Sequence, residues 1–383
     1  MLASALVMLA LLGGITFYFA RRMTQCVQYL FPTFPFIVPL AVFTLLTFAL
    51  VGGFVRSVVP LSAFVKEALR VVSAYWMGAF VYLLVYLVLA DIVVLAGRIL
   101  HLIPRPLTSA VRFASVAAAL ALTAATCVYG FCHAADVRRV SYEASLPGLE
   151  QETTVALVSD LHLGAVGSEK RLESVVREIN AIEPDIVCIA GDLFDNDFAA
   201  IRDPERAAEL LGQIRAPHGV YACLGNHDAG GTFHQMTAFL EGCGVRLLNE
   251  EAVTVDGRLT LAGRLDRSPI GGNGGMQRRQ MTEILAGMDE ALPVVVMDHN
   301  PARADAYGSE ADLILCGHTH KGQIFPGSLI TGWMYTVDYG HARPDENGPQ
   351  VIVTSGAGTW GPPMRVGTDC EVAQIRLTVP GDK

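Results

Sequence analysis

The stretch Thr154–Gly164, which reads TVALVSDLHLG, decides how the C-terminal half of this chain is interpreted. Its first residues form a short apolar run of the kind that makes a buried β-strand. Two possible metal ligands, Asp160 and His162, follow that run directly. An Asp-x-His pair alone is common, so its meaning depends on whether other strands end in the same way.

Four further motifs repeat this arrangement. They are Gly191-Asp192-Leu193-Phe194-Asp195, Gly225-Asn226-His227-Asp228, Asp298-His299-Asn300-Pro301 and Gly317-His318-Thr319-His320. Each follows a segment that we interpret as a strand, at 186–190, 220–224, 294–297 and 313–315. Taken singly, each motif has an ordinary explanation as a turn, a cap or a loop. Together they predict one site, because sites in open α/β sheets form where the strands end.

The remaining patterns alternate helices with strands. Helices are predicted at 168–182, from Asp203-Pro204 onward, at 232–241 and at 276–288; a hairpin is predicted around Asp256-Gly257, and closing strands at 335–337, 351–354 and 372–377. Residues 133–152 are interpreted as a linker and first pairing segment. Alternation of this kind is typical of a layered α/β fold.

The polar residues of the five motifs suit two metal ions. Asp160, His162, Asp192 and His320 would hold one ion, and Asp192, Asn226, His299 and His318 the other, with the Asp192 carboxylate bridging. Nitrogen and oxygen ligands without thiolate suit Mn²⁺, Fe or Zn²⁺, of which we expect Mn²⁺. Two divalent ions about 3.5–4 Å apart can activate water against a phosphorus ester. His227 is a candidate for protonating the leaving oxygen, and Asp195 and Asp228 for orienting histidines.

The N-terminal third has a different character. Hydrophobic residues make up 52% of the chain, with a mean hydropathy of +0.40. Four apolar stretches approach the roughly 20 residues of a spanning helix, at 2–20, 35–55, 71–97 and 113–132. The first stretch alone would also fit a signal peptide, but three more favour a multi-pass membrane anchor. We therefore expect a transmembrane helical region at 1–132, a linker at 133–150 and a catalytic domain at 151–383.

Charge divides along the same boundary. Residues 1–132 carry a net charge of +6, whereas the rest carries −15, for a total of −9. The acidic part offers no basic patch for phosphates, which argues against a nucleic-acid partner, and no protein partner is indicated. Lys and Arg in the predicted loops are evenly divided between the two sides of the membrane. If the first span dominates, Arg21 and Arg22 stay inside and the catalytic domain is extracytoplasmic.

Asp91 lies inside the third apolar stretch, where a carboxyl group is costly and is by default a functional hypothesis. The simpler interpretation, which we favour, is a polar pair with a neighbouring helix. The eight cysteines form no CxxC motif and indicate neither a disulfide framework nor a thiolate metal site.

The complete motif set resembles that of the calcineurin-like metallophosphoesterases, over residues 150–378. The spelling DLHLG at 160–164 and the tail GAGTWGPPMR at 356–365 are similar to the bacterial membrane-associated YkuE/YaeI-like branch. The resemblance implies a four-layer αββα sandwich with a dinuclear centre at the strand ends. We therefore expect a membrane-bound, metal-dependent phosphohydrolase acting on a phosphodiester, a pyrophosphate or a phosphomonoester. Four spans and a short linker favour a lipid-linked substrate.

Two features bear on the substrate. Arg365 is a weak candidate for binding a substrate phosphate, with a surface salt bridge as the alternative. The Gly-rich loop 269–275 with Arg278 and Arg279 is either a mobile lid or an ordinary exposed loop. Two other functional classes stay open: a non-catalytic scaffold that binds metal, and a membrane sensor or transporter with a phosphoesterase-fold domain. The first would be expected to have lost ligands, and all are present here.

Overall fold

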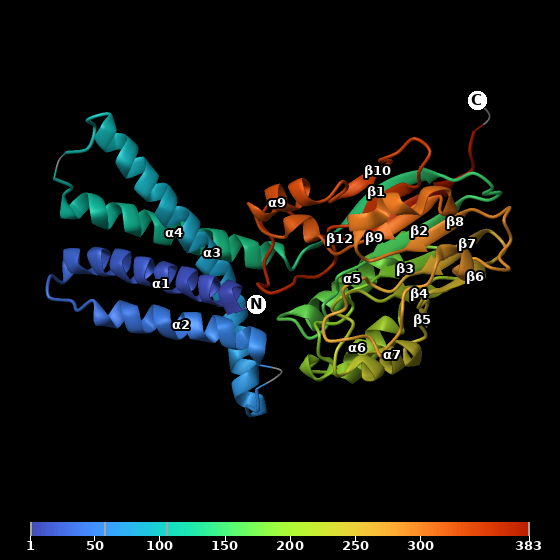
Figure 1. Cartoon of the computed structure of the whole chain (residues 1–383), viewed down its shortest axis with the longest axis horizontal. Helices are drawn as coiled ribbons and strands as arrows, with labels where there is room; N and C mark the ends of the chain where they lie inside the picture. Colours follow the sequence, from blue (N-terminus) through green and yellow to red (C-terminus); the bar gives the residue numbers. More distant parts are fainter. Residues whose placement is uncertain (1, 57–58, 105, 382–383) are drawn as a thin grey trace. The chain divides into compact units, whose positions relative to one another are not determined.

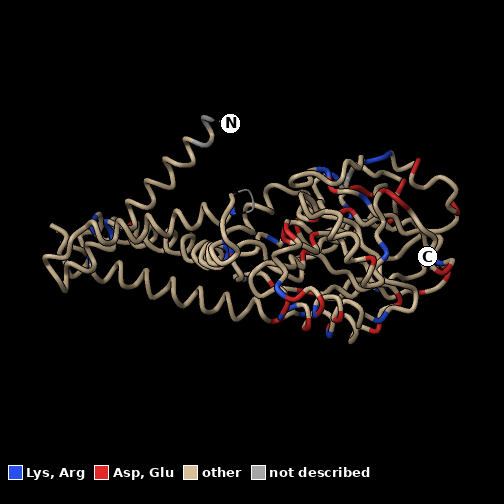
Figure 2. The backbone as a smooth tube through the Cα atoms, turned by 90° about the horizontal axis from the view of Figure 1, so that it is seen from below, with Lys and Arg blue, Asp and Glu red and all other residues tan. Residues whose placement is uncertain are grey.

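The computed structural model describes residues 2–56, 59–104 and 106–381, which divide into two compact units. The first unit contains residues up to Phe131 together with Gly361–Pro363, and the second contains Cys132–Trp360 and the residues from Met364 onward. Figure 2 shows that Asp and Glu are concentrated in the second unit, while the helices of the first carry few charged residues.

The first unit is helical, as predicted. Its helices are α1 (Leu2–Leu30), α2 (Ile37–Val55), α3 (Ala63–Ile99) and α4 (Ser109–His133). All four are long and apolar enough to cross a membrane. Each helix supplies a side chain to a shared buried cluster that includes Phe19, Phe43, Leu87 and Val116. The helices therefore pack on one another through small buried contacts and keep most of their apolar surface outward.

Three helices, α1, α3 and α4, are longer than the sequence pattern predicts. Helix α1 continues through Arg21 and Arg22, and α3 already contains Arg70. The Arg22 side chain is satisfied within the unit, since Nη2 lies 2.7 Å from Asp91 Oδ1 and also donates to Ser115 Oγ at 3.2 Å. An arginine with such partners does not have to end a helix. The loops on which the charge comparison depends are correspondingly shorter.

The same contacts explain Asp91. Its second carboxylate oxygen accepts a hydrogen bond of 2.8 Å from the Tyr18 hydroxyl, so both oxygens have partners on α1. The interpretation of Asp91 as a polar pair with a neighbouring helix is therefore confirmed.

The second unit contains two six-stranded sheets (Figure 1). The first sheet has the order β1 (Val137–Ser145), β12 (Cys370–Thr378), β2 (Thr153–Val158), β3 (Ile186–Ala190), β4 (Val220–Cys223) and β5 (Arg246–Leu247). The second has the order β10 (Gly340–Ala342), β11 (Gln350–Val353), β9 (Leu313–Cys316), β8 (Val294–Met297), β7 (Leu259–Gly263) and β6 (Glu251–Val255). Strands β2, β3 and β4 are mutually parallel, as are β7, β8 and β9.

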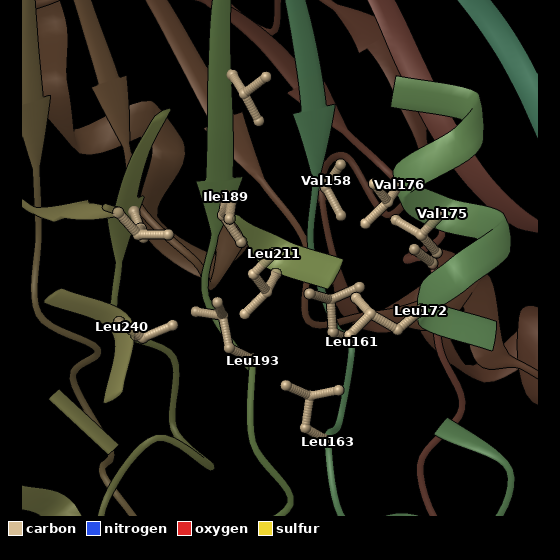
Figure 3. Packing of buried hydrophobic residues seen from close by; sticks show 14 of the residues in the cluster. Val158, Leu161, Leu163, Leu172, Val175, Val176, Ile189, Leu193, Leu211 and Leu240 are labelled. Carbon is tan, nitrogen blue, oxygen red and sulfur yellow. The ribbon is translucent and has the colours of Figure 1, made fainter. Parts of the chain in front are cut away.

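Alternation along β2 shows how the layers are built. Val155 and Leu157 point into the core between the two sheets, while Ala156 and Val158 point into the core beneath the helices. A strand covered on both faces has to be apolar throughout. Figure 3 shows Val158 beside Val175 and Val176 of α5 (Ser168–Ile182), and Ile189 of the next strand in the same cluster beside Leu193 and Leu211.

Helices cover the outer faces of both sheets. Helix α5, with α6 (Pro204–Leu211) and α7 (Phe233–Gly242), packs on the first sheet. The short helix α8 (Met281–Ile284) and the 3₁₀ segment η2 (Pro301–Glu310) pack on the second. The predicted four-layer αββα sandwich is confirmed.

Two local predictions, at 276–288 and 335–337, need correction. The pattern at 276–288 gives only α8, because Arg278 and the backbone of Arg279 are held by Asp298 and Glu250 instead of by a helix. Residues 335–337 form no strand, and the edge strand is β10. The pairing segment expected within residues 133–152 is β1, which runs parallel to β12. Helix α9 (Gly327–Met334) was not predicted.

Candidate metal centre

The structure brings all seven candidate ligands together at the strand ends of the second unit. They form two groups whose donor atoms lie within 4.8 Å of one another: Asp160, His162 and His320, and Asp192, His299 and His318. Asn226 lies at the second group, with its Oδ1 atom 2.8 Å from His318 Nδ1. The two groups contain residues that the sequence assigns to two ion sites, and the assignment of two ions stays a prediction.

In the first group, the donor atoms face one another closely. His320 Nε2 lies 3.3 Å from Asp160 Oδ1 and 3.2 Å from His162 Nε2. Asp160 and His162 are fully buried. Ser159, which directly precedes the motif, donates a short hydrogen bond to Asp160 Oδ2 and helps to orient the carboxylate. The sequence offered no separate signal for this role of Ser159.

In the second group, His299 is fixed by its surroundings. Its Nδ1 atom lies 2.8 Å from the Ala190 carbonyl oxygen. This contact requires a proton on Nδ1, so Nε2 is the ring nitrogen that can bind a metal ion. Nε2 lies 3.1 Å from Asp192 Oδ2 and 3.2 Å from His318 Nδ1.

Asp192 stands between the groups. Its Oδ2 atom is 3.1 Å from His299 Nε2 and 3.9 Å from His162 Nε2, so one carboxylate reaches members of both groups. Its Oδ1 atom accepts a hydrogen bond of 2.8 Å from the backbone N–H of His227. This placement agrees with a bridging carboxylate.

The backbone at the centre is unusual. Five of the seven candidate ligands have positive φ: Asp160, His162, Asp192, His318 and His320, at 47–73°. Side chains other than glycine rarely adopt this left-handed conformation, which costs about 1–3 kcal/mol where it occurs. Such a cluster of left-handed residues is typical of a functional site whose geometry the surrounding fold enforces.

Glycines make the close packing possible. A Cβ atom on Gly225 would lie 2.1 Å from Asp192 Oδ1, and one on Gly317 would lie 2.4 Å from Asp160 Oδ2. The glycine that begins two of the motifs therefore lets one strand-end loop lie directly against the ligand of another.

Burial sets the charge state of these groups. It raises the pKa of Asp160 to about 6 and lowers the pKa of His162 to about 3. The pKa of His320 also lies well below its ordinary value, chiefly because the ring is buried. His299 differs, because the effect of burial is outweighed by the carboxylate of Asp192, which raises the pKa of this histidine well above its ordinary value. Imidazole nitrogens and carboxylates that converge without any thiolate are a donor set suited to divalent metal ions. The residues present therefore fit the metal ions that the motifs imply.

His227 lies beside the first group. Its ring centroid is 5.1 Å from that of His162 and 5.9 Å from that of Trp360, and its Nδ1 atom is buried without a hydrogen-bond partner among the described residues. With His162 and Asp195 it forms a third possible metal-binding group. Trp360 was not singled out from the sequence, because nothing in its local pattern ties it to the motif at 225–228.

The two aspartates expected to orient histidines behave differently. Asp195 Oδ1 lies 3.8 Å from His162 Nδ1, near enough to influence the ring electrostatically. Asp228 instead accepts hydrogen bonds from the backbone N–H groups of Phe194, at 2.8 Å, and Gly225, at 2.9 Å. It joins two strand-end loops, so the predicted role of Asp228 in orienting a histidine is wrong.

Arg365 does not face the substrate side. Its side chain is fully buried, and it donates to the backbone carbonyls of His320 at 2.9 Å, Ser355 at 2.7 Å and Gly358 at 2.6 Å. A guanidinium enclosed by carbonyl groups is not available to a phosphate. The structure therefore contradicts the weak prediction of a substrate-binding Arg365 and indicates that this residue supports the loop of His320.

The basic residues next to the Gly-rich loop are also engaged. Arg278 donates to Asp298 and to the Leu265 carbonyl, and the Arg279 backbone donates to Glu250. The loop is attached to the candidate metal centre, since the Ile270 N–H donates to the carbonyl oxygen of the candidate ligand Asn226 at 2.9 Å. Arg278 is not available to a head group, because the buried Asp298 holds its guanidinium, whereas the half-exposed Arg279 side chain pairs with Glu283. The interpretation of this loop as a lid stays a prediction for Arg279.

Comparison with known proteins identifies the family. The calcineurin-like phosphoesterase family model matches residues 153–322. An uncharacterised metallophosphoesterase of Aquifex aeolicus is 32% identical over 60% of this chain and 87% of its own length. A transmembrane protein with metallophosphoesterase domain of Danio rerio is 32% identical over 69% of this chain and 63% of its own. A metallophosphoesterase of Helicobacter pylori is 30% identical over 61% of each chain, so this chain spans less than two thirds of these last two relatives.

Two other similarities are more distant. UDP-2,3-diacylglucosamine pyrophosphatase LpxG of Chlamydia trachomatis is 39% identical over 74 residues, which are 19% of this chain and 22% of that protein. The solved structure of the NAD nucleotidase of Haemophilus influenzae is 15% identical, with a TM-score of 0.38, over 53% of this chain and 44% of that one. Assignment to the YkuE/YaeI-like branch stays a prediction. The chain belongs to the calcineurin-like metallophosphoesterase family.

Proposed function

We propose that this protein is a membrane-bound phosphohydrolase that uses two divalent metal ions. The observation that carries the proposal is the pair of donor groups, Asp160/His162/His320 and Asp192/His299/His318, with Asp192 reaching both. When bound, two such ions activate water and neutralise charge on the phosphoryl group. Mn²⁺ is the preferred metal, with Fe or Zn²⁺ as alternatives, because the donors are nitrogen and oxygen.

The side chains have distinct tasks in this proposal. Asp192 and Asn226 supply the oxygen ligands that keep the two sites close, and the Ala190 carbonyl keeps the His299 proton on Nδ1. His227 holds a proton on a ring nitrogen for the leaving oxygen, since its Nδ1 has no competing partner among the described residues. The left-handed backbone of five ligands keeps the donor atoms oriented before a substrate arrives.

The substrate we propose is a phosphodiester or pyrophosphate that carries a lipid. Four helices long and apolar enough to cross a membrane support a membrane location, and one relative is a transmembrane protein with metallophosphoesterase domain. The short similarity to a diacylglucosamine pyrophosphatase lends support to a lipid-linked anhydride. We keep an extracytoplasmic catalytic domain as part of the proposal; its support is the pair Arg21 and Arg22 after the first apolar stretch, although both lie within α1 and Arg22 is paired with Asp91.

The test is hydrolysis by the detergent-purified chain in the presence of Mn²⁺. The panel contains bis-p-nitrophenyl phosphate, p-nitrophenyl phosphate and a nucleoside-diphosphate lipid, and metal content is measured in parallel. Asp192→Ala is expected to lose turnover and bound metal, whereas Asp345→Ala, an exposed aspartate of the same unit, should retain both. Full turnover by Asp192→Ala would exclude the proposed centre. Two bound metals without turnover of any ester would favour the scaffold alternative.

A further inference from the structure

Helix α9 presents an apolar surface to the outside of the second unit. Leu329, Ile330, Trp333 and Met334 are 57–86% exposed, and no residue of the helix is buried. Leu329 and Trp333 are four residues apart, as are Ile330 and Met334, and this spacing places all four on one side of the helix. We refer to these four side chains as the apolar face of α9. A soluble domain rarely exposes a tryptophan to 86% together with three large aliphatic neighbours.

The local packing turns this face outward. On the opposite side, a Cβ atom on Gly322 would lie 2.1 Å from the Ser328 nitrogen, so the helix begins in direct contact with the preceding turn. Thr331 also faces inward and donates to Asp338 at 3.0 Å. Small and polar residues therefore attach the helix to the domain, and the large apolar residues are left for another partner.

Both ends of α9 are attached to the metal centre. Its N-terminal end follows the turn η3 (His320–Gly322), which begins with a candidate ligand. Past its C-terminal end, the Tyr335 ring lies 6.2 Å from the ring of His318. Gln323 exchanges hydrogen bonds of 2.8 Å with the backbone of Trp360, whose ring contacts His227. The chain segments that flank α9 on both sides therefore contact the site, and α9 lies next to it.

The chain itself indicates what covers this face. Only Ala134–Asp136 separate α4, which is long and apolar enough to cross a membrane, from strand β1 of the catalytic unit. Such a connection keeps the unit at a bilayer surface. Residues 322–337 contain no charged side chain, although residues 133–383 carry a net charge of −15. An uncharged helix with tryptophan on its exposed side has the composition of a segment that lies in a membrane interface.

We propose that the apolar face of α9 inserts into the lipid bilayer surface and sets the rim of the metal centre at the level of the head groups. The proposal rests on the proposed function and deepens it, because it names the substrate class. A phosphate ester bound at the metals would be an amphiphile whose apolar part stays in the bilayer beside α9. The enzyme would then act on lipid esters in place and would not need to extract them.

The direct test is fluorescence of Trp333 in the full chain reconstituted into phosphatidylcholine vesicles. Trp76→Phe removes the tryptophan of the first unit and leaves Trp333 and Trp360. Lipids brominated near the head of the acyl chain are expected to quench the emission, and the additional Trp333→Phe substitution should remove the quenched part. Quenching of Trp333 by aqueous iodide but not by brominated lipid would refute insertion. Protection of Trp333 from both quenchers would mean that protein covers it, which would also refute it.

The functional test compares a soluble and a membrane-embedded ester. Trp333→Ser/Ile330→Ser is expected to leave hydrolysis of bis-p-nitrophenyl phosphate within twofold and to lower hydrolysis of a vesicle-embedded lipid ester about tenfold. Val379→Ser, at an apolar residue of the same unit that is 43% exposed, is the matched control and should change neither rate. Equal loss on both esters, or loss on neither, would contradict the role of α9. If the unsubstituted chain hydrolyses nothing, the proposed function fails, and the quenching result still decides insertion.

Discussion

An alanine in place of Gly225 should disable the metal centre while leaving the fold intact. The new Cβ atom would lie 2.1 Å from Asp192 Oδ1 and 2.4 Å from the Asp192 nitrogen. To reach ordinary contact at 3.4 Å, the carboxylate has to move by about 1.3 Å, the difference between the two distances. A misplacement of about 1 Å in a catalytic site can cost on the order of 10²-fold in rate. We therefore expect turnover to fall about a hundredfold, with weaker retention of bound metal.

The assay is hydrolysis of bis-p-nitrophenyl phosphate by the detergent-purified chain, with metal content measured on the same sample. Gly231→Ala is the matched control, because its Cβ atom would meet nothing within 4 Å in the same strand-end region. Its rate should match that of the unsubstituted chain. A Gly225→Ala variant with normal turnover and two bound metals would refute the argument that Asp192 has to occupy this position.

Three further outcomes follow from individual contacts. Arg365→Met leaves several buried carbonyls without a donor and should lower the unfolding free energy by about 3 kcal/mol. Thermal unfolding in detergent would measure this loss of stability, and Arg246→Met, at an exposed arginine, is the control that should have no effect. Leu157→Ala, between the sheets, should cost about 2–5 kcal/mol in the same measurement. Asp91→Asn should keep full hydrolysis, because the partners of Asp91 among the described residues are Tyr18 and Arg22 of α1. Loss of hydrolysis would instead favour the sensor hypothesis.

The sequence predicts best the elements that are defined by their own residues. Helix α5 and strand β3 have the bounds that the pattern indicates, Ser168–Ile182 and Ile186–Ala190, because apolar periodicity and Pro184 mark them locally. The seven candidate ligands also lie together, because three of the motifs follow strands of the first sheet and two follow strands of the second, and the two sheets pack face to face with these strand ends at the same end of the sandwich.

Elements that depend on distant partners were not predictable. The segment at 276–280 has a helical pattern, yet Arg278 and Arg279 are bonded to Asp298 and Glu250 far away in the chain. The burial of Arg365 depends on the carbonyl group of His320 in another loop and on those of Ser355 and Gly358 in its own loop. At the start of helix α9, Gly322 lies close to the backbone at Ser328. The hydrophobic pattern of the sequence does not indicate this contact.

The order of the first sheet has a consequence for biosynthesis. Strand β1, which follows the last membrane-type helix directly, has β12 as its hydrogen-bonded neighbour, and β12 in turn pairs with β2. On the ribosome, the apolar helices and β1 emerge first, whereas residues 370–378 emerge more than 200 residues later. The sheet therefore closes only after nearly the whole domain has been translated. Until then β1 exposes an unpaired edge next to the membrane, where a chaperone or a neighbouring nascent chain would meet it.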